Sequence, residues 1–415
     1  MQGLYIHIPF CRHKCSYCDF YSIEKLGDID SFVSVLCSEI AMRSHKEIVG
    51  AVPFSSVFFG GGTPSLLQAE QMKRIVDLLR ENYSFDDNCE WTMECNPGTV
   101  SFASLSAYRS LGINRLSFGV QSLHAAELQF LERIHSAGEV TESVKAARDA
   151  GFENINLDVM FAVPGQTMQS YEQSLKGIMA LEPEHVSAYS LIYEEGTPLH
   201  ARLLKGEVQP LPEEVDAGMY EFTIDFLEAH GYHQYEVSNF AKNGFRCRHN
   251  LCYWQGQNYV AFGPSAHGYV GDVRYRNARN IGKYSQSVLC GALPTIGSEQ
   301  LTKEQRMFEL IFLTLRSTGI PVSMMLDRFA CDLVSILQTH LAWMIDEEYL
   351  TVGEHVRLTK KGFLVCDDIT LSVVSAVEGA LGLEWERAED FGEESGDELQ
   401  HDRESPNPLV SISMP

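Results

Sequence analysis

Three cysteines near the start of the chain have the spacing of a metal-binding loop. Cys11, Cys15 and Cys18 follow a short apolar segment in a C-x3-C-x2-C pattern, and thiols at this spacing can converge on one point. Iron–sulfur clusters are held by cysteine thiolates, so three thiols on a cluster of four irons leave one iron open. A metal with an open position is a reaction site, whereas a fully ligated metal is a structural one. The thiols alone also allow a zinc site completed by His7, His13 or another thiol.

The segments after this loop alternate between apolar strand patterns and helical patterns. Strands are expected near residues 5–8, 56–59, 90–94, 115–119, 154–160 and 185–192. Helical spacing of apolar residues separates them, for example over 68–80, 104–111, 139–150 and 168–181. This alternation predicts a parallel sheet with right-handed crossovers. We therefore expect an α/β fold with a partial (β/α)6 barrel open on one side, and a doubly wound open sheet is the alternative.

Polar groups stand where several of these strands end. A glycine-rich turn at Gly60–Pro64 would let the backbone approach a ligand closely. Glu94 ends the third strand, and a carboxylate in that position can bind ribose hydroxyls. Gln121, Arg133 and Asp158 follow from the next two units. Each residue alone reads as an ordinary satisfied polar group, but the set at successive strand ends indicates a binding pocket.

Together these motifs resemble the radical S-adenosylmethionine (SAM) superfamily, and within it the coproporphyrinogen III dehydrogenase group. The resemblance is carried by residues 5–20, 60–64, 93–98, 117–122, 158–166 and 190–198. It implies a [4Fe–4S] cluster on Cys11, Cys15 and Cys18, with SAM on the open iron. The SAM contacts that it implies are Tyr5, Tyr17, Gly61, Gly62, Thr63, Glu94, Gln121, Arg133 and Asp158. Thr63 departs from the superfamily's motif, which has an acid at that position.

The group contains two kinds of protein, and three features of this chain separate them. HemN enzymes oxidatively decarboxylate two propionates of coproporphyrinogen III, whereas HemW proteins are regarded as haem chaperones. HemN-type chains carry a further cysteine where this sequence has Phe20, and a long segment where only ten residues precede Cys11. Residues 249–254 contain H-N-x-x-Y-W, a signature associated with the HemW group. We therefore expect a haem chaperone; a coproporphyrinogen III dehydrogenase is the alternative, and a zinc-stapled barrel enzyme is less favoured.

The H-N-x-x-Y-W signature supplies groups that a haem could use, and it consists of His249, Asn250, Tyr253 and Trp254. His249 offers an imidazole for haem iron, while the two aromatic rings offer flat faces for a porphyrin. A buried structural histidine beside core aromatics is the alternative. Further candidates for haem or its propionates follow in the chain: His267, Arg276 and Arg279. The alternative role of the two arginines is to balance the charge of an acidic surface. The sequence assigns no catalytic residue.

Composition limits the classes of partner that the protein could bind and the cellular compartment in which it could act. The chain has 415 residues, 45% of them hydrophobic, and a net charge of −24, which argues against nucleic-acid binding. Eleven cysteines, no N-terminal signal pattern and no uninterrupted apolar run of about 18 residues predict a reduced, cytoplasmic protein. The resemblance implies haem as cargo and haem-accepting respiratory proteins as receivers. It leaves room for peripheral contact with membrane proteins and for a homodimer.

Four regions are expected along the chain. Residues 1–199 would form the radical SAM partial barrel, and 200–297 an α+β middle segment that contains the H-N-x-x-Y-W motif. Helical patterns at 301–316, 322–329 and 332–345, followed by a hairpin at 350–358, predict a winged-helix-like domain over 298–370. Residues 371–415 are expected to be a mostly disordered acidic tail, with one amphipathic helix at its start.

Overall fold

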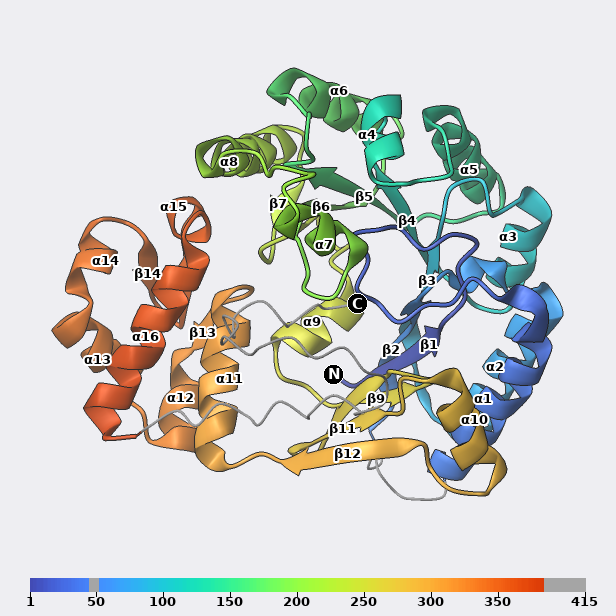
Figure 1. The fold of residues 1–415 in the computed structure, drawn as a ribbon. Helices are drawn as coiled ribbons and strands as arrows, with labels where there is room; N and C mark the ends of the chain where they lie inside the picture. The colour runs from blue at the N-terminus through green and yellow to red at the C-terminus, as the bar shows by residue number, and fades with distance from the viewer. Residues whose placement is uncertain (45–51, 384–415) are drawn as a thin grey trace. The chain divides into compact units, whose positions relative to one another are not determined.

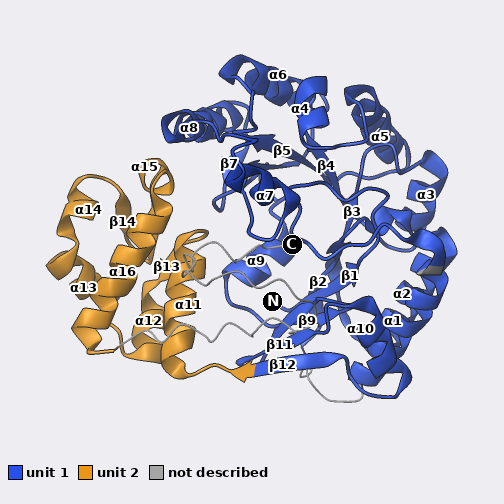
Figure 2. Ribbon diagram, viewed as in Figure 1, with its two compact units in different colours: residues 1–298 blue, residues 299–415 orange. Residues whose placement is uncertain are grey.

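The computed structural model describes residues 1–44 and 52–383 (Figure 1). It contains two compact units, residues 1–298 and residues 299–415, which Figure 2 distinguishes by colour. In the described part of the chain, no helix is both long enough and apolar enough to cross a membrane. The predicted acidic tail from residue 384 onward lies outside the described residues.

A large, mostly parallel sheet forms the centre of unit 1. Its parallel strands from the first half of the chain are β1 (Gly3–Ile8), β2 (Phe54–Gly61), β3 (Phe85–Cys95), β4 (Arg115–Gln121), β5 (Ile155–Phe161) and β6 (His185–Ser190). These strands match the predicted segments in number and order, and the predicted α/β fold class is confirmed. Near-continuous burial along β1 and β2 explains their apolar runs, because parallel strands are covered on both faces.

Helices cover the outer face of this sheet (Figure 1). They are α1 (Ile29–Ser44), α2 (Ala69–Asn82), α3 (Phe102–Ser110), α4 (Ala125–Phe130), α5 (Ala137–Asp149) and α6 (Met168–Met179). Their starts are encoded locally: Ser101, Ser136 and Thr167 each accept a hydrogen bond from the backbone three residues later in a capping box. The helices thereby begin just after the loops at the carboxyl ends of the strands, where the predicted site residues lie.

The second half of unit 1 extends the sheet at both edges. It adds α7 (Pro198–Leu204), α8 (Glu213–Ala229), β7 (His233–Gln234), β8 (Asn239–Ala241), α9 (Arg248–Trp254), β9 (Tyr259–Phe262), β10 (His267–Val270), β11 (Val273–Asn277), α10 (Ile281–Leu289) and β12 (Thr295–Gln300), of which the last two residues are counted in the C-terminal unit. The sheet order is β12-β11-β10-β9-β1-β2-β3-β4-β5-β6-β8-β7. Strand β1 therefore lies between β2 and β9, and it pairs in parallel with both. The expected division at 199/200 falls inside α7, and both flanking parts belong to unit 1.

The C-terminal unit combines a helical core with a small antiparallel sheet. Its elements are α11 (Lys303–Leu315), β13 (Ile320–Pro321), α12 (Val322–Phe329), α13 (Leu333–His340), α14 (Ala342–Asp346), β14 (Leu350–Val352), β15 (His355–Leu358), α15 (Lys360–Phe363) and α16 (Cys366–Leu381). The single helix expected over 332–345 is wrong, because Leu341 adopts φ −131° and separates α13 from α14. The expected boundary at 370/371 falls inside α16, whose apolar residues, among them Val373 and Val377, pack into the core of this unit.

Candidate functional site

The three predicted metal-binding cysteines lie in one loop that leaves the carboxyl end of β1. Both ends of the loop are fixed, because Cys11 N donates to Ile23 O at 3.0 Å and Ile23 N donates to Pro9 O at 2.7 Å. Inside the loop Cys18 N donates to Cys15 O at 3.2 Å. Cys11 and Cys15 are buried, Cys18 is partly buried, and none of the three is in a disulfide. The loop is therefore a closed turn of chain that presents three reduced thiols.

Two neighbouring side chains point at these thiols. Thr63 Oγ1 lies 3.6 Å from Cys11 Sγ, and Arg133 Nη1 lies 3.7 Å from Cys15 Sγ. Burial raises the pKa of the Cys18 thiol to about 12, so a thiolate there requires a compensating positive charge. A guanidinium supplies such a charge at Cys15, and bound metal ions would supply it for the set.

The donor set fits an iron–sulfur cluster. Within residues 1–44 and 52–383, no group of three or more His, Cys, Asp or Glu side chains converges on a position for one metal ion. Three cysteine thiolates are the ligands that a four-iron cluster with one open iron uses, so the chemistry of this donor set fits such a cluster. His13, one of the two histidines considered for a zinc site, lies 3.2 Å from the carboxylate of Glu24 and 3.5 Å from that of Glu132.

The glycine-rich turn after β2 packs directly against the thiol loop. Gly61 has φ +102°, and a Cβ atom there would overlap the ring of His7. A Cβ atom at Gly62 would lie 2.7 Å from the carbonyl oxygen of Phe10. Gly62 N also donates to Ile8 O at 2.8 Å. The glycines are thus required by the chain's own packing, which brings the turn to the edge of the thiol loop.

Two buried carboxyl groups stand on β3 and β5: Glu94 is one residue before the carboxyl end of β3, whereas Asp158, expected near a strand end, is in the middle of β5. Glu94 Oε2 accepts a hydrogen bond from Gly61 N at 3.2 Å, and Asp158 Oδ1 accepts one from Asn156 Nδ2 at 2.6 Å. Burial and the nearby charge of Asp158 raise the pKa of Glu94 to about 8. Burial also raises the pKa of Asp158. Buried carboxyl groups of this kind are well suited to polar contacts with a ligand that replaces water.

Arg133 and Gln121 hold the side of the site formed by β4. Arg133 Nη2 donates to Asn96 Oδ1 and to Gly119 O, each at 2.7 Å. Gln121 has φ 66°, a left-handed conformation that is uncommon for a residue with a side chain, and its Oε1 accepts from Tyr189 Oη at 2.8 Å. Asn96 and Tyr189 were not predicted as site residues, although Asn96 follows the predicted strand 90–94 and Tyr189 lies within the predicted strand 185–192.

Of the two remaining predicted SAM contacts, Tyr5 lies in the middle of β1 and Tyr17 lies in the thiol loop. Tyr5 Oη is 3.2 Å from His7 Nδ1, and the pKa of Tyr5 is raised by burial and by the charge of Glu94. Tyr17 is in the thiol loop, where burial raises the pKa of its hydroxyl while Arg133 opposes the shift. Contacts link several of the predicted SAM residues to the thiol loop or to each other: Thr63 and Arg133 contact the cysteines, and Glu94 contacts Gly61 and lies near Asp158.

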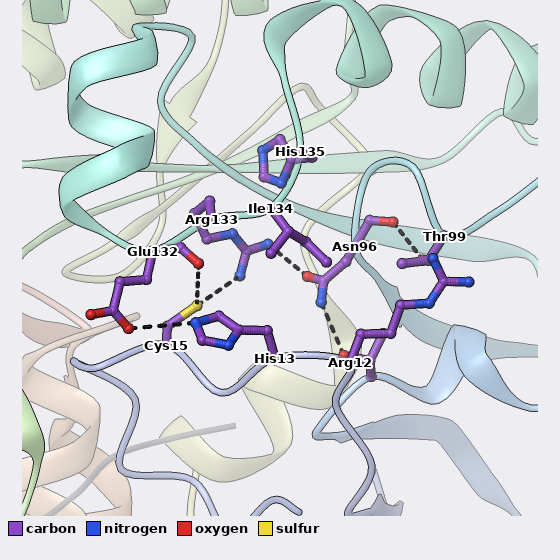
Figure 3. Close-up of a pocket in the computed structure, with 10 residues that line it drawn as sticks. Arg12, His13, Cys15, Asn96, Thr99, Glu132, Arg133, Ile134 and His135 are labelled. Atoms are coloured by element: carbon purple, nitrogen blue, oxygen red, sulfur yellow. Dashed lines mark hydrogen bonds and ion pairs between the residues drawn. The ribbon is translucent and has the colours of Figure 1, made fainter. Parts of the chain in front are cut away.

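A pocket lies beside this loop, between it and the connections that follow β3 and α4 (Figure 3). Its lining residues are Arg12, His13, Cys15, Thr63, Asn96, Thr99, Glu132, Arg133, Ile134 and His135. Figure 3 shows Arg133 directed toward both Cys15 and Asn96. The pocket therefore shares the thiol and guanidinium of the predicted cofactor site.

The H-N-x-x-Y-W motif lies at the opposite end of the strands, on the short helix α9. His249 is fully buried against the starts of β1 and β2, where a Cβ atom at Gly3 would be 3.1 Å from its ring. Its Nδ1 is 3.0 Å from Ser56 Oγ and its Nε2 is 2.8 Å from Tyr253 Oη. Burial, with a smaller effect of the Arg115 charge, lowers the pKa of His249 to about 3.

Tyr5 lies between the motif and the thiol loop, because its ring stacks on that of His249 with centroids 6.3 Å apart while its hydroxyl meets His7. The predicted haem contacts Tyr253 and Trp254 are each 8% exposed, and Asn250 is partly buried with Oδ1 making no hydrogen bond. Because both ring nitrogens of His249 are occupied, a haem iron could reach it only after Ser56 or Tyr253 had been displaced. The sequence motif could not predict this position, because it does not specify at which end of the strands the motif lies.

The fold and the thiol site together define a radical SAM-type protein. Residues 5–178 match the model of the radical SAM superfamily, and residues 301–365 match that of the HemN C-terminal domain. The structure superposes on coproporphyrinogen III oxidase (HemN) from Escherichia coli with a TM-score of 0.76 over 90% of each chain. The two sequences are 23% identical, so this similarity establishes the fold.

Relatives over nearly the whole length give the family. The chain is 37% identical to the heme chaperone HemW of Bacillus subtilis over 374 residues, which are 89% of this chain and 98% of that protein. It is 34% identical to the heme chaperone HemW of Lactococcus lactis, over 87% of this chain and 94% of that protein. The chain belongs to the HemW family.

Proposed function

We propose that this protein is a haem chaperone that carries a [4Fe–4S] cluster with SAM and delivers haem to acceptor proteins. The observation that carries the proposal is the 37% identity to the Bacillus subtilis heme chaperone HemW over 98% of that protein's length. Absence of a further cysteine at Phe20 supports it, because HemN-type chains have one there. Haem is the cargo, and respiratory haem proteins receive it. The protein acts in the cytoplasm as a homodimer and reaches these acceptors by peripheral contact at the membrane.

In this proposal Cys11, Cys15 and Cys18 hold the cluster. When bound, such a cluster supplies an electron and an open iron that SAM can ligate. The protein's own residues bind and orient SAM: Tyr5, Tyr17, Gly61, Gly62, Thr63, Glu94, Gln121, Arg133 and Asp158. The buried, protonated carboxyl group of Glu94 can donate a hydrogen bond at neutral pH, which the corresponding carboxylate could not do.

Arg133 has the best-defined role in this set. Its guanidinium is fixed by Asn96 and the carbonyl of Gly119 while Nη1 faces Cys15, so it can balance negative charge on the thiolates. Thr63 stands where the superfamily's motif has an acid and contacts Cys11. With threonine at this position, the glycine-rich turn has no carboxylate of its own beside Cys11.

An oxygen-free reconstitution tests the cluster. Wild type should take up the iron and sulfide of one [4Fe–4S] cluster, and its electron paramagnetic resonance signal should change when SAM is added. Cys18→Ser should lose most of the iron, whereas Cys290→Ser, which removes an exposed cysteine far along the chain, should not. Equal iron in both variants would exclude the thiol loop as the cluster site.

Two further assays separate chaperone from enzyme. The reconstituted protein should bind haem and pass it to an apo-haem protein without consuming coproporphyrinogen III. The alternative, a coproporphyrinogen III dehydrogenase, is favoured by the fold that it shares with HemN. Sustained conversion of coproporphyrinogen III to protoporphyrinogen would establish that alternative and refute the chaperone.

A further inference from the structure

The hairpin formed by β10 and β11 presents four functional side chains on one face. In its antiparallel register His267 is opposite Arg276, and Tyr269 is opposite Arg274. Cross-strand partners and residues two apart point to the same side of a sheet, so these four side chains share a face. His267 is exposed and the other three are partly exposed.

The other face of the hairpin is closed by the protein itself. Tyr275 is buried there, donates from Oη to Ala261 O at 3.2 Å, and lies under the guanidinium of Arg43 on α1. Gly268, its cross-strand partner, has room for no side chain because the Tyr275 ring occupies that space. The face that carries His267 is therefore the one available to a ligand.

A row of tyrosines borders this face. Tyr269 pairs with Tyr259 of β9, and their ring centroids are 6.3 Å apart. Tyr259 in turn meets Tyr253 of the H-N-x-x-Y-W motif edge to face, at 4.5 Å. The rings are inclined to one another, by 90° for Tyr253 and Tyr259 and by 43° for Tyr259 and Tyr269, so they border the face with apolar ring surface and hydroxyl groups.

The hairpin carries more basic than acidic side chains, although the protein as a whole is acidic. Residues 267–277 carry Arg274 and Arg276 against a single acid, Asp272, in a protein whose net charge is −24. The Asp272 carboxylate already accepts a hydrogen bond from Tyr269 Oη at 3.2 Å. Arg279 follows the hairpin and lies 5.9 Å over the ring of Tyr21 in the thiol loop. The face therefore favours a ligand that carries carboxylates.

The two histidines of this region differ in availability. In the described residues, neither ring nitrogen of His267 makes a hydrogen bond, and the side chain is exposed. Both ring nitrogens of His249 are hydrogen-bonded inside the barrel. An imidazole that ligates iron needs a free nitrogen, and only His267 offers one without rearrangement of the core.

We propose that haem binds on this hairpin face, with His267 as the axial iron ligand. The porphyrin lies along Tyr259 and Tyr269, and Arg274 and Arg276 pair with its propionates. The proposal rests on the proposed haem-carrying function and assigns that function a site. Tyr253 then links the H-N-x-x-Y-W motif to haem as a support for Tyr259, and His249 acts as a positioning residue.

Haem titration of the full-length protein tests this site. Ferric haem is added to wild type, His267→Ala and His233→Ala, the last being a control that removes another exposed histidine from a strand. Wild type and the control should give the absorption and electron paramagnetic resonance spectra of an imidazole-ligated haem. His267→Ala should lose that spectrum, and added free imidazole should restore it, because a small ligand can enter the vacated position.

The arginines are tested separately with two porphyrins. Arg274→Gln and Arg276→Gln should each weaken haem binding about tenfold, the loss expected for one charge-assisted hydrogen bond, without changing the spectrum. The same variants should bind haem dimethyl ester, which lacks both carboxylates, as wild type does. If the variants bound haem itself as tightly as wild type does, the arginines would not be propionate ligands.

The outcomes distinguish the site from the function. If wild type binds no haem, the proposed function itself fails. If wild type binds haem and His267→Ala gives an unchanged spectrum, the function stands and this site is refuted. Loss of the spectrum in a folded His249→Gln variant but not in His267→Ala would assign the iron to His249. Circular dichroism of each variant shows whether it is folded.

Discussion

Nε2 of His249 lies 2.8 Å from Oη of Tyr253, one helical turn further along α9, while Nδ1 of the same ring lies 3.0 Å from Ser56 Oγ on β2. The imidazole thus joins a helix to the start of the central sheet. It also stacks on Phe58, with ring centroids 5.1 Å apart. The side chain with the strongest sequence signal for haem therefore has a structural role in this fold.

Replacing His249 by alanine should destabilise the protein. The substitution leaves a cavity and two buried hydroxyl groups, on Ser56 and Tyr253, without their partner, so we expect a loss of about 3 kcal/mol in the free energy of unfolding. Urea denaturation followed by tryptophan fluorescence measures it. His233→Ala, at an exposed position, should change the free energy little. A His249→Ala variant as stable as wild type would contradict the structural role.

Gly61→Ala should disrupt the packing of the glycine-rich turn against the thiol loop. Its left-handed φ of +102° costs a residue with a side chain roughly 1–2 kcal/mol, and the new Cβ atom would overlap the His7 ring. We expect lower stability and weaker SAM binding by equilibrium dialysis. Gly138→Ala, on α5, is the matched control, because the nearest atom to its new Cβ would be 3.8 Å away. Unaltered SAM binding in Gly61→Ala would contradict the packing described here.

The pH dependence of stability should carry a contribution from Glu94. Its pKa is about 8 in the folded protein and about 4.5 in the unfolded chain, so the folded state binds more protons between these values. Stability from this group is therefore complete below pH 4.5 and is lost as the pH rises toward 8. Glu94→Gln mimics the protonated carboxyl group at every pH, so its stability should not carry this pH-dependent contribution. The difference in Tm between Glu94→Gln and wild type should grow from pH 5 to pH 8, and a constant difference would contradict the raised pKa.

The start of α11 provides a test in the C-terminal unit. Thr302 Oγ1 accepts from Gln305 N at 3.1 Å, and Gln305 Oε1 accepts from Thr302 N at 2.8 Å. Thr302→Ala removes one of these bonds and should destabilise the unit by about 1 kcal/mol. Faster amide hydrogen exchange in α11 would report it. Thr302→Ser keeps the hydroxyl and should exchange at the wild-type rate; if it exchanged as fast as Thr302→Ala, the cap would not be the cause.

The parallel core could be predicted because its signals are local. The buried strand β2 contains the apolar run 57–59, and the carboxyl ends of parallel strands necessarily meet at one edge. That geometry alone brought Glu94 near Gly61 and Asp158. The thiol spacing likewise needed no tertiary information, since Cys11, Cys15 and Cys18 share one loop.

The second half of unit 1 was harder to predict, because its strands are short and its contacts are distant in sequence. Strand β9 has four residues, and it is placed by pairing with β1, about 250 residues earlier. Motif reading did not reveal that His249 faces the starts of the strands, because a signature identifies residue types and not the end of a barrel that they occupy. The same limit hid Asn96 and Tyr189, whose roles depend on Arg133 and Gln121.

The position of β1 has a consequence for synthesis of the protein. Its partner β2 emerges from the ribosome soon afterwards, but its other neighbour, β9, begins only at Tyr259. At a translation rate of about 5–20 residues per second, that interval is on the order of tens of seconds. During this time one edge of β1 remains unpaired and the thiol-bearing turn is attached to an incomplete sheet. A cell that loads metal on the nascent chain would have this interval in which to do so.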